Sequence, residues 1–159
     1  MRVATSAVVG MGGFARIYHE DTKEIEQEGL GRQVAQVAIP ADQRDFADEL
    51  AAMQQRGIRV FASLLQMLAE MRAEIDLVCI PTGIPLHRPM AIAALPAGFP
   101  LLVPPPADFI IQTFYAILPA EARSPGGGSV GYHHVYNPDY PLFKELFCSG
   151  KLGRVRQIR

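Results

Sequence analysis

The residues best suited to chemistry form a glycine-rich stretch near the start of the sequence. Gly10, Gly12 and Ala15 have the spacing Gly-x-Gly-x-x-Ala and directly follow the apolar run 4–9. A strand, a glycine turn and a helix in this order are typical of dinucleotide-binding sites. Gly10 would permit the tight turn, Gly12 would let the backbone approach a pyrophosphate, and Ala15 would let the helix pack on the strand. The phosphates would accept hydrogen bonds from N–H groups at the positive end of the helix. A glycine turn without a ligand is the alternative.

Composition narrows the class of protein. The chain has 159 residues, of which 49% are hydrophobic and 19% charged, as expected for one globular domain rather than a disordered chain. The net charge of −1 argues against a surface for nucleic acid or anionic membranes. Cys79 and Cys148 are far apart and neither belongs to a Cys-x-x-Cys pair, so we predict neither a metal site nor a disulfide framework.

The N-terminus allows a second interpretation. Arg2 followed by apolar residues could begin a secretory signal. However, three glycines interrupt the stretch, which is also too short to span a bilayer. We therefore predict a strand and turn here, in a cytoplasmic protein.

The rest of the sequence alternates between strand and helix patterns. We expect helices over 14–28, 42–56, 64–71, 87–95 and 107–118, and strands over 33–39, 58–61, 76–80, 99–103 and 130–135. This alternation predicts an α/β fold with a doubly wound parallel sheet, Rossmann-like. The connections should be right-handed, and a ligand should lie at the carboxyl ends of the strands.

Three motifs in this order resemble a known family. They are VVGMGGFAR at 8–16, EIDLVCIPTGIPLHRPMAIAALPAG at 74–98 and VGYHHVYNPDYPLFKELFCSGKLGRVRQIR at 130–159. The chain resembles the nucleotide-binding half of the glucose–fructose oxidoreductase, inositol dehydrogenase and MocA-like oxidoreductases. The resemblance implies a dinucleotide-binding domain over 1–150 and the start of a truncated second domain over 151–159, so that most or all of the family's second sheet domain is lacking. It also implies NAD(P)-dependent hydride transfer on a sugar, polyol or related alcohol.

The resemblance extends the candidate site beyond the glycine turn. In the family, the threonine at position 82 and its neighbours line the nicotinamide end of the cofactor, NAD or NADP. The histidine at 87 opens the following helix. The cofactor-binding residues we predict are Gly10, Gly12, Gly13, Phe14, Ala15, Thr82 and His87.

One departure from the family concerns the adenosine ribose. Many NAD-binding domains have an acidic residue at the end of the second strand, where this sequence has Ile39. Asp42 could substitute, and Arg44 could favour a 2′-phosphate. We favour the simpler interpretation that Asp42 caps the next helix.

A more serious departure follows the strand 99–103. There the family has Glu-Lys-Pro, whose lysine lies near the substrate, and this sequence has Pro104, Pro105 and Pro106. Proline has neither a charge nor an N–H, so it cannot orient a hydroxyl or move a proton. The family's other acid/base residues belong to the second domain. We therefore expect an oxidoreductase-type domain that is weak or inactive alone.

Two further interpretations stay open. One is a non-catalytic nucleotide-binding sensor or assembly module, which the prolines favour. The other is S-adenosylmethionine binding, which we rank last because the second and third motifs do not support it. The strand candidate 154–159 would be an unpaired sheet edge, and such edges attract partners. We therefore expect a homo-oligomer or a companion chain.

Overall fold

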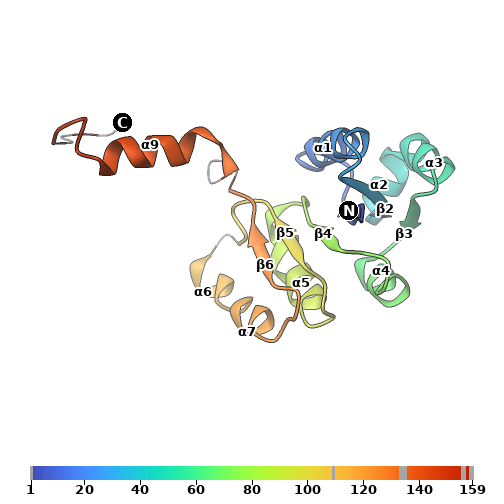
Figure 1. Ribbon diagram of the computed structural model, residues 1–159. Coiled ribbons are helices and arrows are strands. Elements are labelled where there is room, and N and C mark those ends of the chain that lie inside the picture. Colours follow the sequence, from blue (N-terminus) through green and yellow to red (C-terminus); the bar gives the residue numbers. More distant parts are fainter. Residues whose placement is uncertain (1, 109, 133–135, 155–156, 158–159) are drawn as a thin grey trace.

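A parallel sheet forms the centre of the fold. The computed structural model describes residues 2–108, 110–132, 136–154 and 157 (Figure 1). The sheet has the strand order β3-β2-β1-β4-β5-β6, and every neighbouring pair is parallel. Its strands are β1 (Ala4–Val9), β2 (Gly31–Val37), β3 (Arg59–Phe61), β4 (Leu77–Cys79), β5 (Leu101–Val103) and β6 (Gly128–Val130). This order confirms the predicted doubly wound, Rossmann-like sheet.

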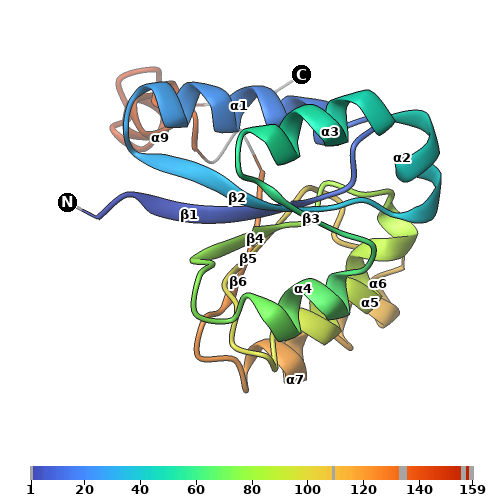
Figure 2. The ribbon, with the colours of Figure 1, turned by 90° about the vertical axis from the view of Figure 1, so that its right-hand side faces the viewer.

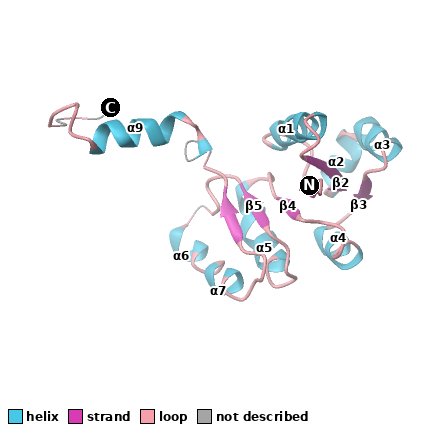
Figure 3. Ribbon diagram, viewed as in Figure 1, coloured by secondary structure: helices cyan, strands magenta, loops and turns pink. Residues whose placement is uncertain are grey.

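Helices lie on both faces of the sheet, as the right-handed connections of parallel strands require (Figures 1 and 2). One layer consists of α1 (Ala15–Gln27), α2 (Pro40–Asp45) and α3 (Ala47–Gln55). The other consists of α4 (Leu64–Glu70), α5 (Ile84–Ala94), α6 (Ile111–Phe114) and α7 (Leu118–Glu121). The last helix, α9 (Asp139–Cys148), extends away from both layers (Figure 3).

The main core lies between the sheet and the layer of α4, α5 and α7. Its largest buried side chains include Met67, Met71, Ile80, Leu95 and Phe99. The serine that precedes α4 caps that helix as its sequence pattern suggests, because the Ser63 hydroxyl accepts a hydrogen bond from the Gln66 N–H at 3.2 Å. Within the sheet, the parallel pairing of β1 with β4 places their carboxyl ends beside each other.

The helix predicted over 42–56 is in fact two helices, which is a correction. Pro40 begins α2, because its fixed φ suits the first position of a helix. Phe46 separates α2 from α3 with φ −128° and ψ 33°, outside helical values. Asp42 consequently lies inside the first turn of α2 and is not its N-cap, a position that Ile39 occupies.

The segment after β5 also differs from its prediction. The expected helix over 107–118 is replaced by the short helices α6 and α7, with Pro119 in the first turn of α7. The last strand, β6, begins two residues earlier than expected and ends at Val130. The strand predicted over 154–159 falls mostly outside the described residues. Among the helices that are described, none is long and apolar enough to cross a bilayer.

Candidate nucleotide-binding site

The glycine turn joins β1 to α1 at the carboxyl edge of the sheet. Gly10 has φ +97° and Gly13 has φ +58°, conformations in which glycine avoids the strain of a side chain. The Gly10 N–H donates to the Val37 carbonyl at 2.9 Å, which fixes the turn to β2. A Cβ at Gly10 would lie 3.4 Å from Cγ2 of Thr82, so the structure brings these two predicted residues together.

The turn presents backbone donors at the start of α1. The Ala15 N–H donates to the Gly12 carbonyl at 3.2 Å, and the Arg16 N–H to the Gly13 carbonyl at 3.3 Å. Within the described part of the chain, the N–H groups of Gly12, Gly13 and Phe14 have no backbone acceptor. A Cβ at Gly13 would meet no atom within 4 Å. Open space beside unpaired N–H groups at a helix N-terminus suits a phosphate.

Buried side chains hold the turn from behind. The Gly10 carbonyl accepts hydrogen bonds from Gln36 Nε2 at 2.9 Å and from His19 Nε2 at 3.2 Å. The Gln36 side chain is fully buried, and its Oε1 accepts from Gln33 Nε2 at 2.9 Å. Sequence reasoning missed these three residues. The available signal was Gln36 itself, a glutamine between the apolar residues Ala35 and Val37 of β2.

His19 makes the stability of the fold dependent on pH. Burial lowers the pKa of His19 below its ordinary 6.5, against the opposing effect of the Gly10 carbonyl. The folded chain therefore takes up a proton on this ring at a lower pH than the unfolded chain, which does so as the pH falls through about 6.5. We expect the free energy of unfolding to decrease below this pH. In His19→Gln, whose amide can still donate to Gly10, thermal unfolding between about pH 7.5 and about pH 5.5 should show a shallower decline. An unchanged slope would assign the dependence to other groups.

Asp42 is the acidic side chain next to the turn. Only 8% of its surface is exposed. Burial raises the pKa of its carboxyl, and the nearby N–H groups of Ile39 and Met11 oppose the rise. Its Oδ2 has no hydrogen-bond partner among the described residues. The carboxylate thus lies between the start of α2 and the glycine turn, with one acceptor atom unused.

An aromatic ring packs against the middle of the turn. A Cβ at Gly12 would lie 3.3 Å from Cζ of Phe46, so the space beside this glycine is filled by the ring. The Arg16 guanidinium lies 5.7 Å from the centre of the same ring, within the range of a cation–π contact. Phe46 and Arg16 are further residues that sequence reasoning missed, because the phenylalanine fitted the apolar pattern of a helix.

Two predicted residues follow β4, Thr82 in the loop and His87 in the helix α5. The methyl group of Thr82 fills the space where a side chain at Gly10 would begin. His87 lies within α5, three residues after its start at Ile84, and is only 1% exposed. Its Nε2 lies 2.9 Å from the Thr82 carbonyl and its Nδ1 3.0 Å from the Pro106 carbonyl. Each ring nitrogen lies within hydrogen-bond distance of a backbone carbonyl, and the tautomer decides which of the two carbonyls accepts the N–H, so His87 lies between the loops that follow β4 and β5.

The remaining predicted residues occupy the rim of this region. Ala15 is fully buried at the start of α1, where the close approach of the helix to the sheet requires a small side chain. Phe14 is 43% exposed, and its ring packs edge-to-face on Tyr18. Pro104, at the end of β5, is buried, and Pro105 is half-buried. Neither proline offers a charge or an N–H to a ligand.

The strand order places a ligand crevice beside the glycine turn. Connections lead in opposite directions from β1 and β4, and ligands of doubly wound sheets bind at such a switch point, outside the carboxyl ends of the strands. Gly10 and Thr82 meet at this point. Fold and site together define a Rossmann-type dinucleotide-binding domain.

Comparison with known proteins specifies the family. Residues 4–113 match the family GFO_IDH_MocA, described as the oxidoreductase family with an NAD-binding Rossmann fold. The chain belongs to this family, which confirms the resemblance noted in its motifs. Inositol 2-dehydrogenase 2 of Saccharopolyspora erythraea is 28% identical over 127 residues, which are 78% of this chain and 36% of that protein.

Solved structures share the fold. A scyllo-inositol dehydrogenase from Lactobacillus casei, with bound NAD(H) and scyllo-inositol, has a TM-score of 0.76 at 22% identity and aligns with 96% of this chain. The WlbA dehydrogenase from Chromobacterium violaceum, in complex with NADH and UDP-GlcNAcA, also has a TM-score of 0.76, at 23% identity over 97% of this chain. The chain spans 43% and 42% of these two proteins, respectively.

Proposed function

We propose that this chain binds NAD(H) with the pyrophosphate on the N–H groups of Gly13 and Phe14. The observation that carries the proposal is the open glycine turn at the switch point of the sheet, which has Thr82 beside Gly10 and unpaired N–H donors at Gly13 and Phe14. Gly10 and Gly13 supply the backbone conformations, and Gln36 and His19 keep the Gly10 carbonyl turned inward. The dinucleotide-binding domain would comprise residues 1–150.

On the adenosine side, we propose that Asp42 replaces the acidic residue missing from the end of β2. Its Oδ2 is unpartnered but buried, so we propose that the carboxylate turns toward the bound nucleotide, where it would accept a hydrogen bond from a ribose hydroxyl and repel a 2′-phosphate. Arg44 is exposed in the last turn of α2. This arrangement favours NADH over NADPH.

The bound cofactor would accept or donate a hydride at its nicotinamide, next to the loop that contains Thr82. The relatives suggest a sugar, polyol or related alcohol as the second substrate. The residues of this chain position the cofactor through Gly10, Thr82 and the buried His87. Pro104 and Pro105 provide no acid or base for the alcohol proton, and such help is worth about 10²–10⁴-fold in rate. The reaction would therefore be weak or absent in this chain alone.

The prolines favour a second candidate function, that of a nucleotide-binding sensor or assembly module without turnover. The two functions share cofactor binding and differ in catalysis. Turnover of a polyol with NAD⁺ by the isolated chain would exclude the second.

Titration with NADH and NADPH tests cofactor binding, which both candidate functions require. We expect the fluorescence of NADH to change on binding and the Tm to rise. At about 100 times Kd the added stability is about 2.7 kcal/mol. For a chain of this length that corresponds to a rise of about 5–10 °C. NADPH should bind more weakly. A lack of response to both nucleotides at millimolar levels would refute the proposal.

A further inference from the structure

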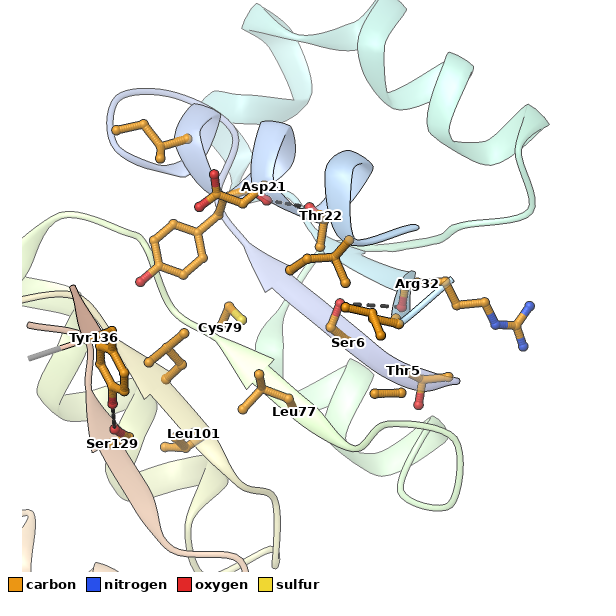
Figure 4. A pocket seen from close by; sticks show the side chains of 18 of the residues that line it. Thr5, Ser6, Asp21, Thr22, Arg32, Leu77, Cys79, Leu101, Ser129 and Tyr136 are labelled. Atoms are coloured by element: carbon orange, nitrogen blue, oxygen red, sulfur yellow. Dashed lines mark hydrogen bonds between the residues drawn. The ribbon is translucent and has the colours of Figure 1, made fainter. Parts of the chain in front are cut away.

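An apolar groove lies on the sheet face opposite α4 to α7, and we call it the sheet groove. Its volume is about 1250 Å³. It runs beside α1, with strands β4 and β5 as its floor (Figure 4). Its lining includes Ile17 and Tyr18 from α1 and Leu77, Cys79, Leu101 and Leu102 from the sheet.

The sheet groove is a place where the fold lacks a helix. Parallel sheets are normally covered on both faces, because the strands of such sheets are apolar on both sides. Here the layer of α1, α2 and α3 covers only the half formed by β1, β2 and β3 (Figures 1 and 2). On that face the half formed by β4, β5 and β6 has no helix in the described part of the chain.

The helix α9 carries apolar side chains that no described part of the chain covers. Leu142, Phe143 and Leu146 are 58%, 54% and 36% exposed, and no residue of α9 is buried. The rings of Phe143 and Phe147 lie 4.9 Å apart. These four side chains occupy neighbouring positions on the helix and form an apolar stripe.

We propose that the sheet groove binds α9 of a second copy of this chain. The segment that precedes α9 contributes Tyr136 and Pro138 to the rim of the groove, and the Tyr136 hydroxyl lies 3.0 Å from Ser129 Oγ of β6. The chain is thus held at the rim, from which α9 leads away (Figure 1). In this direction α9 lies away from the floor of its own groove and is available to another molecule.

Two copies of the chain can exchange their α9 helices, and the resulting interface is self-complementary. Each copy carries one groove and one apolar helix, so two copies can exchange their helices around a two-fold axis and close as a dimer. The ten residues of α9 measure about 15 Å and the thirteen of α1 about 20 Å, so α9 fits alongside α1. The dimer would add the missing helix to each sheet, and of the nucleotide-binding turn only Phe14 lines the groove.

Paramagnetic labelling of the full chain tests where α9 binds. Cys148 at the end of α9 is exposed and Cys79 is buried, so a nitroxide reagent will attach to Cys148. A nitroxide-labelled chain without ¹⁵N is mixed with an unlabelled ¹⁵N chain. We expect broadening of amides around the groove, such as those of Ser6, Leu77 and Leu102. If the mixed sample shows no broadening around the groove, the exchange is refuted, even where a separate sample of ¹⁵N chain that itself carries the nitroxide shows such broadening.

The oligomeric state gives an independent readout. In light scattering the chain should be a dimer, and Leu142→Ser with Phe143→Ser should weaken the dimer about 100-fold or more. Leu65→Ser is the matched control, because Leu65 is a 68% exposed leucine on α4, on the other face of the sheet. A monomeric chain, or equal weakening by both variants, would overturn the proposal. NADH binding by the stripe variant should be unchanged, so the test is separate from that of the proposed function.

Discussion

Gly13→Asp is expected to weaken NADH binding by about 100-fold or more, whereas Gly13→Asn should change it by less than about tenfold. Gly13 has φ +58°, which aspartate and asparagine tolerate better than other side chains. No atom lies within 4 Å of a Cβ added there, so both variants should fold. The two side chains have nearly the same shape and differ in charge.

The charge is the reason for the large effect. A carboxylate at Gly13 would stand beside the pyrophosphate and repel it, at a cost of about 4 kcal/mol for unit charges about 4 Å apart near a protein surface. Fluorescence titration of both variants with NADH measures the difference, and thermal unfolding without nucleotide verifies that they are folded. Equal affinities of the two variants would place the pyrophosphate elsewhere.

The second large effect concerns stability. We expect His87→Ala to lower the free energy of unfolding by about 3–5 kcal/mol, because it leaves a cavity and removes the ring from between the Thr82 and Pro106 carbonyls, one of which loses its N–H donor. The wild-type ring lies 2.9 Å from the Thr82 carbonyl and 3.0 Å from the Pro106 carbonyl and is 1% exposed. The Tm should fall by about 10 °C or more.

A variant on the same helix serves as the control. Ile92→Ala on α5 removes a side chain that is 38% exposed and should lower the Tm by only a few degrees. His87→Ala should also weaken NADH binding, since Thr82 loses the contact that fixes its backbone. A His87→Ala protein with an unchanged Tm would show that the two loops are held by other contacts.

Much of the fold was predictable because it depends on local patterns. The apolar run before Gly10, the spacing of Gly10, Gly12 and Ala15, and the alternation of strand and helix patterns led to the correct sheet and family. Local patterns failed where they were ambiguous. Phe46 fitted a continuous helix, and only its backbone angles of −128° and 33° reveal the break between α2 and α3.

The candidate site was less predictable, because its details depend on contacts between distant segments. Family resemblance included His87 among the cofactor-binding residues, and the fold places each of its ring nitrogens within hydrogen-bond distance of a carbonyl, 5 and 19 residues away in sequence. Gln36 and His19 support Gly10 from β2 and α1. No pattern within one segment indicates such a network.

The sequence alone determined the order of the elements and the glycine turn, since periodicity and glycine conformation act over a few residues. Tertiary structure decided which side chains face the turn, which are buried behind it, and that half of one sheet face lacks a helix while α9 extends unpacked. These features follow from the packing of segments far apart in the chain, where burial and hydrogen bonding are properties of the whole fold.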